Sequence, residues 1–448
     1  MNIKIILVVT LLLCPGTLFG QLSKEIRENW HQWRGPMACG LGVARKPPLE
    51  WSESKNIVWK VAIDGQGTST PIIWNEKLFL LTTIDTGKAD PNLPPPDQQP
   101  ERPFGITFPN TIHNYVIICL NRNTGEEIWC KTAVSKIPHQ GHHGDNDFAS
   151  SSPTTDGERL FVWFGSAGLF CYDLNGEKLW DRDLGEVETR LSFGEGSSPV
   201  VHENRLVLVR DHEGQSVITV FDTKTGDTVW EKERDEPSAW STPVIATRLG
   251  TTQVVTNGKN RIRSYDLVDG RLIWECGGQV SNVTPSPIAV GNVALCTSGY
   301  RGSALQAIAL DSQGDVTDSE KVLWSRSNGT PYVPSPLLYC GHLYFNQSNQ
   351  GILSCVHALN GQEVFGRTRL PSISQIYSSP VGGGGRVYVT GRDGTTLVLK
   401  RGPEFEVLAT NKLDDEINAS AALVGHQLFL RGKKFTYCIA EQQSVSTP

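Results

Sequence analysis

A phrase that recurs along almost the whole chain constrains its fold more than any other feature. Each copy begins with a Ser-Pro or Thr-Pro pair, continues as short β-rich runs, and ends with a Gly turn leading to Trp. The starting prolines are Pro71, Pro153, Pro199, Pro243, Pro287, Pro336 and Pro380, with a degenerate eighth start near Ala421. After a first interval of 82 residues, the spacings are 46, 44, 44, 49, 44 and 41. A fixed period of this length with four β runs per copy predicts propeller blades.

The ends of the copies fix the topology. They lie at Trp129, Trp180, Trp230, Trp274, Trp324, Phe365 and, weakly, near Val407. An eighth end, Trp59, precedes the first start. The N-terminal strand must then complete the sheet that the last three strands begin, which closes the ring without an exposed edge. We therefore predict an all-β fold, one eight-bladed β-propeller of four-stranded antiparallel blades over residues 45–440. A linear β-solenoid is the alternative. It would not require an end of a copy to precede the first start.

The two ends of the chain lie outside the repeats. Lys4 followed by the apolar run 5–13 is typical of a signal peptide, predicted here as residues 1–20. A buried first strand and lipid attachment at Cys14 are the alternatives. Residues 21–44 form a leader and residues 441–448 a tail. The protein is therefore expected to be exported, to the periplasm or beyond the cell, and to be a monomer.

Net charge, hydropathy and cysteine content restrict the possible partners and cross-links of the chain. The net charge of −6 argues against nucleic acid as a partner. No segment after the signal is long and apolar enough to be transmembrane, although peripheral association with a membrane stays open. Nine cysteines remain after removal of the signal, and their pairing is not specified by the sequence. Three of them, Cys119, Cys171 and Cys438, occupy equivalent places in the repeats and are expected to be buried packing residues.

The long first interval reflects an insertion. Residues 84–112 are rich in proline and polar residues and are expected to extend from the first blade. They form either a passive loop or an arm that docks a partner.

The ends of the copies resemble a known repeat. "DTKTGDTVW" at residues 222–230 and "NRNTGEEIW" at residues 121–129 resemble the tryptophan-docking motif of PQQ-type propellers. That family includes quinoprotein alcohol dehydrogenases and BamB-like outer-membrane assembly proteins. The leader contains "WHQWRGP" at residues 30–36 and looks like the opening of exported PQQ-like repeat proteins of planctomycete-type bacteria. That subgroup has no function that the resemblance could assign to this chain. The resemblance implies the eight-bladed fold, which by itself does not specify function.

The chain departs from the quinoprotein dehydrogenases in its cysteines. It has neither their adjacent Cys-Cys pair nor a C-x-x-C-H haem motif. The resemblance makes PQQ with calcium a possible cofactor. Calcium would require carboxylate and amide oxygens, for which Glu195, Asp211 and Asp393 are scattered candidates.

Two long loops mark the predicted ligand face, where each outer strand leads to the next inner strand. Trp129 and Pro153 are 24 residues apart and Trp180 and Pro199 are 19 apart, against 12 to 15 in the other blades. Polar and aromatic residues of this face are predicted to line a ligand-binding funnel: Glu195, Arg190, Asp211, His212, Trp240, Arg301, Tyr332, Tyr377 and Arg392. Three residues of the first loop are candidate metal ligands: His142, His143 and Asp145. Solvated turns and a packed central shaft are the alternatives.

The sequence contains no compact catalytic motif. There is no G-x-S-x-G, no phosphate-binding loop and no H-E-x-x-H. The first hypothesis is an exported, non-catalytic scaffold that binds a protein or a small polar ligand. The alternatives are a PQQ- and calcium-dependent dehydrogenase with an atypical pocket and a glycan-binding propeller at the cell surface.

Overall fold

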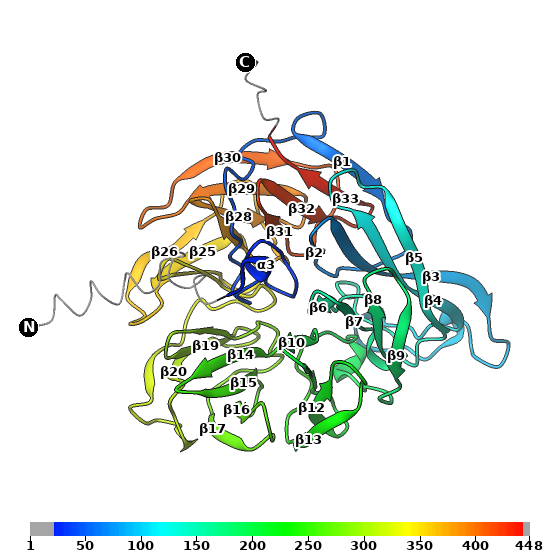
Figure 1. Ribbon diagram of the computed structural model, residues 1–448, viewed down its shortest axis with the longest axis horizontal. Coiled ribbons are helices and arrows are strands. Elements are labelled where there is room, and N and C mark those ends of the chain that lie inside the picture. The colour runs from blue at the N-terminus through cyan, green and yellow to red at the C-terminus, as the bar shows by residue number, and fades with distance from the viewer. Residues whose placement is uncertain (1–21, 442–448) are drawn as a thin grey trace, which may run out of the picture.

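Eight β-sheets surround a central axis in the computed structural model, which describes residues 22–441 (Figure 1). Each sheet contains four antiparallel strands, and one has an added short fifth strand. The predicted eight-bladed propeller of four-stranded antiparallel blades is confirmed. The predicted signal peptide and nearly all of the predicted C-terminal tail lie outside the described residues.

The first four blades follow one another in chain order, each from its inner to its outer strand. Their strands are β2 (Ile72–Trp74), β3 (Lys77–Ala89), β4 (Thr111–Asn121) and β5 (Glu127–Lys136); β6 (Thr154–Thr155), β7 (Arg159–Trp163), β8 (Leu169–Asp173) and β9 (Lys178–Arg182); β10 (Val200–His202), β11 (Arg205–Arg210), β12 (Ser216–Asp222) and β13 (Thr228–Arg234); and β14 (Val244–Arg248), β15 (Thr251–Asn257), β16 (Ile262–Asp266) and β17 (Leu272–Cys276).

The next three blades repeat this pattern. Their strands are β18 (Ile288–Val290), β19 (Val293–Ser298), β20 (Ala304–Ala309) and β22 (Val322–Arg326); β23 (Leu337–Tyr339), β24 (His342–Asn346), β25 (Ile352–His357) and β26 (Glu363–Arg369); and β27 (Val381–Gly383), β28 (Arg386–Thr390), β29 (Thr395–Lys400) and β30 (Val407–Lys412). The short β21 (Gly314–Asp315) leaves its own blade and pairs in parallel with β17.

The eighth blade joins the two ends of the described chain. It contains β31 (Ala422–Val424), β32 (Gln427–Arg431), β33 (Phe435–Ile439) and, as its outer strand, the N-terminal β1 (Ile57–Ala62). β1 pairs antiparallel with β33, and Trp59 lies opposite Cys438. The ring is thereby closed by main-chain hydrogen bonds between the ends of the chain, and no blade is left with an unfilled sheet.

Helices are few and short. α3 (Lys24–Arg27) is capped by the Ser23 side chain, which accepts a hydrogen bond from the Ile26 N–H. The 3₁₀ turns are η2 (Pro96–Gln98), η3 (Pro103–Gly105), η4 (Gly165–Ala167) and η5 (Arg190–Ser192). Within residues 22–441, no helix has the length and hydropathy needed to cross a lipid bilayer.

The recurring Trp and the recurring Gly turn meet across neighbouring blades. Trp180 Nε1 donates to the Thr223 carbonyl oxygen of the next blade (3.1 Å), and the indole covers Gly226 in the same turn. Gly226 has a φ of +74°, and a Cβ there would lie 2.6 Å from Trp180 Cδ2. Only glycine fits both the turn and the indole above it. The same pair forms between Trp59 and Gly125, Trp129 and Gly176, Trp230 and Gly270, and Trp324 and Gly361.

The three equivalent cysteines lie beside these tryptophans. Cys119, Cys171 and Cys438 are fully buried and stand opposite Trp129, Trp180 and Trp59 in the paired strands. They are small packing residues, as predicted.

The Ser-Pro starts form a hydrogen-bonded belt around the axis. At six of the eight joints between blades, the Ser or Thr that precedes the starting proline, or Ala421 in the last blade, accepts through its hydroxyl the main-chain N–H of the equivalent residue in the preceding blade. These bonds run from Thr70 to Ser152, Ser152 to Ser198, Ser198 to Thr242, Ser286 to Ser335, Ser335 to Ser379 and Ser379 to Ser420, at 2.8–3.0 Å. We call these eight residues the hydroxyl belt. The repeated Ser or Thr thus satisfies a buried N–H at the crowded axis.

The leader lies across the belt at the centre of the ring (Figure 1). Trp30 exchanges two main-chain hydrogen bonds with Ile73 of β2, and Gly42 donates to the Gly382 carbonyl oxygen of β27. Arg34, buried at 1% exposure, donates to the carbonyl oxygens of Pro336 and Pro380. The leader therefore belongs to the propeller core and closes one end of its axial opening.

The run of glycines at residues 382–385 makes room for the leader. A Cβ at Gly383 would lie 2.8 Å from the Ala44 Cβ, and one at Gly384 would lie 2.4 Å from Pro47 Cδ. These positions form the end of β27 and a turn that the chain following the leader crosses closely.

We expect the Trp–Gly pairs to govern stability. Replacing Trp180 by Ala removes a buried indole from the joint between two blades and should lower the free energy of unfolding by about 3 kcal/mol. Gly226→Ala should destabilise the same joint, because it adds a Cβ under the indole. Both variants are compared with Leu249→Ala, which truncates an exposed side chain in the β14–β15 turn. Urea denaturation followed by circular dichroism measures the effect, and equal midpoints for all variants would contradict it.

Candidate functional site

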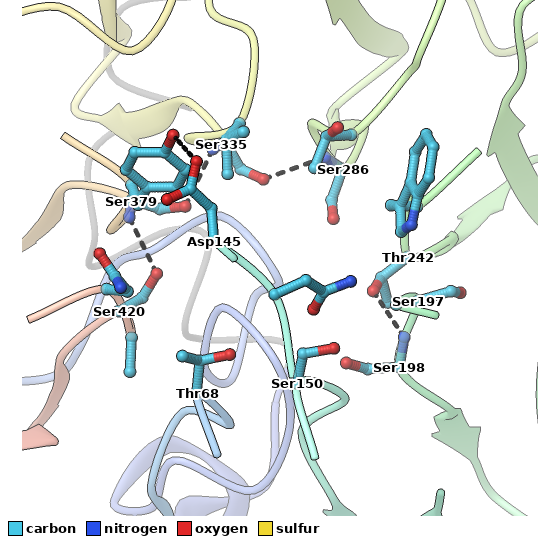
Figure 2. Close-up of a pocket in the computed structure, with 18 of the residues that line it drawn as sticks. Thr68, Asp145, Ser150, Ser197, Ser198, Thr242, Ser286, Ser335, Ser379 and Ser420 are labelled. Atoms are coloured by element: carbon cyan, nitrogen blue, oxygen red, sulfur yellow. Dashed lines mark hydrogen bonds between the residues drawn. The ribbon is translucent and has the colours of Figure 1, made fainter. Parts of the chain in front are cut away.

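A funnel opens at the axis, above the hydroxyl belt (Figure 2). Its volume is about 330 Å³. Seven of the eight belt residues line it, together with Trp33 of the leader. Trp33 Nε1 donates to the Ser286 hydroxyl (2.9 Å), which holds the indole in place. The belt and Trp33 thus form the floor, and the long inter-blade loops form the walls.

Aromatic side chains line an arc of the wall over blades three to seven. Phe193 and Trp240 lie with ring centroids 6.5 Å apart, and Tyr300 and Tyr332 are 4.8 Å apart. Trp240 Nε1 donates to the Gly194 carbonyl oxygen (2.7 Å), which fixes the indole against the neighbouring loop. Tyr377 completes the arc. The funnel therefore presents aromatic faces above a polar floor.

The loop of residues 138–150, which we call the strap, reaches across the funnel mouth. It leaves the first blade, and its Asp145 contacts the seventh. Tyr377 Oη donates to Asp145 Oδ2 (2.6 Å) and Arg392 Nη1 donates to Oδ1 (2.6 Å). Figure 2 shows Asp145 beside Ser379 and Ser335, on the side of the funnel opposite Ser197 and Ser198. The strap therefore divides the mouth of the funnel.

Asp145 is held ionised by these contacts. Its partial burial opposes ionisation, but the hydrogen bonds from Tyr377 and Arg392 and the charge of Arg392 outweigh it, and the pKa of Asp145 is lowered. Arg392 also donates to Glu416 (2.9 Å) and stacks over the Tyr377 ring at 4.9 Å. The cation is thus shared by two carboxylates.

The proline-rich insertion folds back over the mouth. Gln99 binds Phe108 through both its amide nitrogen and its carbonyl oxygen, so residues 99–108 form a closed turn. At its tip, the Phe104 ring meets His143 and Phe193 edge to face, with both centroid distances 5.3 Å. We call residues 99–108 together with the loop 186–197 the lip. The insertion thus forms part of the wall of the funnel.

Glu195 lies deep in the wall between the strap and η4. Ser166 donates to Glu195 Oε1 through its N–H (2.9 Å) and its hydroxyl (2.7 Å). A Cβ at Gly165 would lie 2.3 Å from Oε2, so the carboxyl group packs directly on this glycine. Burial raises the pKa of Glu195 to about 7, because desolvation outweighs the Ser166 bonds and the nearby positive charges.

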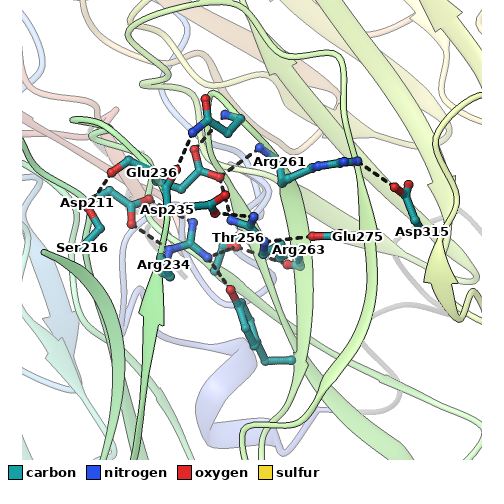
Figure 3. A network of polar contacts seen from close by, with 12 residues as sticks. Asp211, Ser216, Arg234, Asp235, Glu236, Thr256, Arg261, Arg263, Glu275 and Asp315 are labelled. Carbon is teal, nitrogen blue, oxygen red and sulfur yellow. Dashed lines mark hydrogen bonds and ion pairs between the residues drawn. The ribbon is translucent and has the colours of Figure 1, made fainter.

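Asp211 belongs to a buried structural network and does not line the funnel (Figure 3). Arg234 binds it through Nε (2.7 Å) and Nη2 (3.0 Å), and both side chains are buried. Arg234 also donates to the Thr256 and Tyr265 hydroxyls (both 2.9 Å). Asp211 was predicted to bind a ligand, but it binds Arg234 on the outer strand β13. Through Arg234, it is connected to Thr256 and Tyr265, so this network links the third and fourth blades.

The structure places four of the nine predicted ligand residues in the funnel wall: Glu195, Trp240, Tyr332 and Tyr377. Arg392 is not among the lining residues and contacts the wall through Asp145 and Tyr377. Arg190 and Arg301 are not among the lining residues, and Arg301 stacks on Tyr300. His212 stabilises its own turn, with Nε2 at 3.0 Å from the Gln215 carbonyl oxygen. Ligand binding by the four wall residues stays a prediction.

The predicted metal ligands do not converge. Within the described part of the chain, no three His, Cys, Asp or Glu side chains are grouped to hold a metal ion. His142 Nδ1 faces the His143 carbonyl oxygen (2.9 Å), and its ring packs edge to face on Phe148. His143 Nδ1 accepts the Asp145 N–H (3.1 Å). The Nδ1 atoms of His142 and His143 therefore contact main-chain groups of the strap, and Asp145 binds Tyr377 and Arg392. The structure does not support a metal site formed by these three residues.

Sequence reasoning missed several lining residues. Trp33 was assigned to the leader, Phe104 to an insertion, and Phe193 and Tyr300 were not selected as ligand residues. The belt residues were recognised only as a repeat signal. Nearly all of these residues lie directly before a proline, and all lie where the inner strand of a blade begins. That shared position is the signal that could have placed the belt at the axis.

We expect Glu195 to make stability depend on pH. Its folded-state pKa lies above the value of an unfolded glutamate, so its contribution falls as pH rises from about 4.3 towards 7. Glu195→Gln keeps an acceptor for Ser166 but cannot ionise. The melting temperature of the variant should therefore gain on the wild type between acidic and neutral pH. Thermal unfolding across this range, with Glu186→Gln as the exposed control, measures the difference, and parallel curves would contradict it.

The anchor of the strap is also testable. Asp145→Asn removes the charge that binds Arg392, and we expect faster amide hydrogen exchange in residues 142–147. Because the pair is partly exposed, global stability should change by no more than about 1 kcal/mol. Glu50→Gln, which breaks the exposed Lys55 pair, is the matched control and should leave strap exchange unchanged. Unchanged exchange in Asp145→Asn would show that the strap does not depend on this anchor.

Comparison with known proteins agrees with this architecture. A family model described as outer membrane protein assembly factor BamB matches residues 113–367. BamB from Moraxella catarrhalis is 12% identical, with a TM-score of 0.53 over 86% of this chain and 99% of that chain. No curated protein sequence matches significantly.

Dehydrogenase structures share the fold as well. A quinohemoprotein alcohol dehydrogenase from Comamonas testosteroni is 10% identical, with a TM-score of 0.62 over 95% of this chain and 82% of that chain. A europium-containing methanol dehydrogenase is 11% identical, with a TM-score of 0.58 over 92% and 90% of the two chains. The resemblance to PQQ-type and BamB-like propellers is confirmed. At these identities the solved structures establish the fold alone.

Proposed function

This chain belongs to the family of the outer membrane protein assembly factor BamB, and from that premise we propose that it is an exported, non-catalytic scaffold whose funnel binds a small polar ligand. The single observation that carries the proposal is the funnel itself. It is concave, lined by aromatic faces and hydroxyls, and closed at its floor by the belt and Trp33. Sites of this kind typically take small molecules. Export rests on the predicted signal peptide.

The charge of the wall restricts the ligand. Among the described residues that line the funnel, none is Lys or Arg, and two are acids, Asp145 and Glu195. Asp145 is already paired with Arg392. A strongly anionic ligand would find no direct charge partner in the wall, so neutral ligands are favoured.

The wall does not fit the quinone cofactor PQQ, which the fold family makes a possible cofactor. PQQ carries three carboxylates and would require cationic partners and calcium ligands. The guanidinium of Arg392, which contacts the wall residues Asp145 and Tyr377, is engaged by Asp145 and Glu416. The described residues offer no cluster of three acidic, histidine or cysteine side chains around the funnel. The dehydrogenase alternative therefore has no support from this site.

A protein partner is the second candidate. The family description names an assembly factor, and the lip exposes Phe104 and Leu191 beside the funnel mouth. Exposed apolar side chains of this kind favour contact with another surface. Weak attachment to a membrane through such a partner is compatible with this role.

A ligand screen tests the proposed function. Thermal shift across a diverse set of soluble small molecules, followed by calorimetry, should yield a ligand whose affinity falls about tenfold in Tyr332→Ala, from loss of one aromatic contact. Leu249→Ala should bind like the wild type. PQQ with calcium chloride is included, and we expect no heat of binding. Tight PQQ binding, or ligands that are indifferent to Tyr332, would contradict the proposal.

A further inference from the structure

We infer that the ligand of the funnel is a neutral oligosaccharide, bound along the aromatic track that runs from Phe104 on the lip past Phe193 and Trp240. This inference rests on the proposed function and adds the chemical class of the ligand. It is carried by the juxtaposition of that track with hydrogen-bond acceptors in a wall that lacks basic side chains.

The track is continuous from the surface into the funnel. Phe104 and Phe193 have ring centroids 5.3 Å apart, and Phe193 and Trp240 are 6.5 Å apart. Tyr300 and Tyr332 lie further round the wall. Sugar rings present apolar C–H faces that pack on aromatic rings and hydroxyl edges that need polar partners. A row of aromatic rings matches successive sugar units better than one compact ring.

The lip holds exposed apolar side chains in an unfavourable backbone conformation. Phe104 has a φ of +63° and is 65% exposed, and Leu191 has a φ of +52° and is 47% exposed. Both strain and apolar exposure oppose stability of the free protein, and residues of this kind cluster at binding sites. A ligand that covers Phe104 would offset the cost of its exposure.

The polar groups of the wall suit a ligand that donates hydrogen bonds. Each oxygen of Asp145 accepts one bond from the protein, and a carboxylate can accept about four. The Ser150 hydroxyl, which donates to the Glu195 carbonyl oxygen, keeps its own oxygen as a further acceptor in the wall. Sugar hydroxyls can donate to these oxygens. Because the wall lacks Lys and Arg, uronic or sulfated sugars would be rejected.

The shape of the site favours an extended ligand. A funnel of about 330 Å³ lies at the lower end of the range of roughly 300–1,000 Å³ for small-molecule sites. The lip carries the aromatic surface to the open edge of the funnel, where Phe104 lines the wall and is still mostly exposed. One end of a short glycan would thus enter the funnel while the following sugar units rest on the lip, beside the strap.

Calorimetry with the mature chain tests the inference. The probes are short neutral gluco-, manno- and xylo-oligosaccharides, with oligogalacturonate as the anionic arm and chitosan oligomers as the cationic arm. We expect at least one neutral series to bind, and Phe104→Ala and Trp240→Ala to weaken it about tenfold each. Leu249→Ala truncates another mostly exposed apolar side chain, remote in sequence from the lip, and should bind normally. Phe104 is mostly exposed, so its variant should keep the wild-type melting temperature.

The outcomes separate this inference from the proposed function. If no neutral glycan binds while another small molecule binds in a Tyr332-dependent manner, the oligosaccharide assignment falls and the scaffold function stands. If nothing binds the funnel, both fall. Preference for the anionic or cationic arm, or equal glycan affinity in wild type, Phe104→Ala and Trp240→Ala, would also overturn the assignment.

Discussion

The joint between neighbouring blades is the interaction on which the rest of this structure depends. At the outer edge, five docking tryptophans each cover a glycine of the next blade and donate to a carbonyl oxygen beside it, as Trp180 does at Gly226. At the axis, six of the eight belt hydroxyls accept the N–H of the equivalent residue one blade earlier, as Ser198 does for Ser152. A blade alone would leave both groups unsatisfied, so the blades are stable only as a ring.

This joint explains why the fold could be predicted from the sequence while much of the site could not. The Trp, the Gly turn and the Ser-Pro start are local signals that recur at a fixed spacing, so each copy confirms the others. Tyr332 and Tyr377 were also predictable, because they stand just before inner strands. The contact of Asp145 with Tyr377 joins positions 232 residues apart, on loops that no repeat describes. No local pattern indicates which loop crosses the axis.

The buried pairing of Asp211 shows the opposite error. A polar turn after β11, the second strand of its blade, pointed to the ligand face, yet Arg234 takes up both carboxylate oxygens. An exposed acid and a buried, paired acid look alike in sequence, and only the register of β13 decides between them. The histidines of the strap were ambiguous for the same reason. His142 and His143 pack against phenylalanines and bind main-chain groups within their own loop, so their close spacing reflects the turn.

The two ends of the propeller axis differ, and this difference determines which end can bind a ligand. The leader closes one end of the axial opening, with Arg34 tied to two carbonyl oxygens and Trp33 facing the funnel. At the other end, the insertion, the strap and the loop 186–197 contribute to the wall of the funnel. Because Arg392 neutralises Asp145, the carboxylate keeps its acceptor oxygens without presenting an unpaired charge. Asp145 can therefore accept hydrogen bonds from a ligand but does not attract a ligand by net charge. This property favours a neutral, hydroxyl-rich ligand over an anionic cofactor.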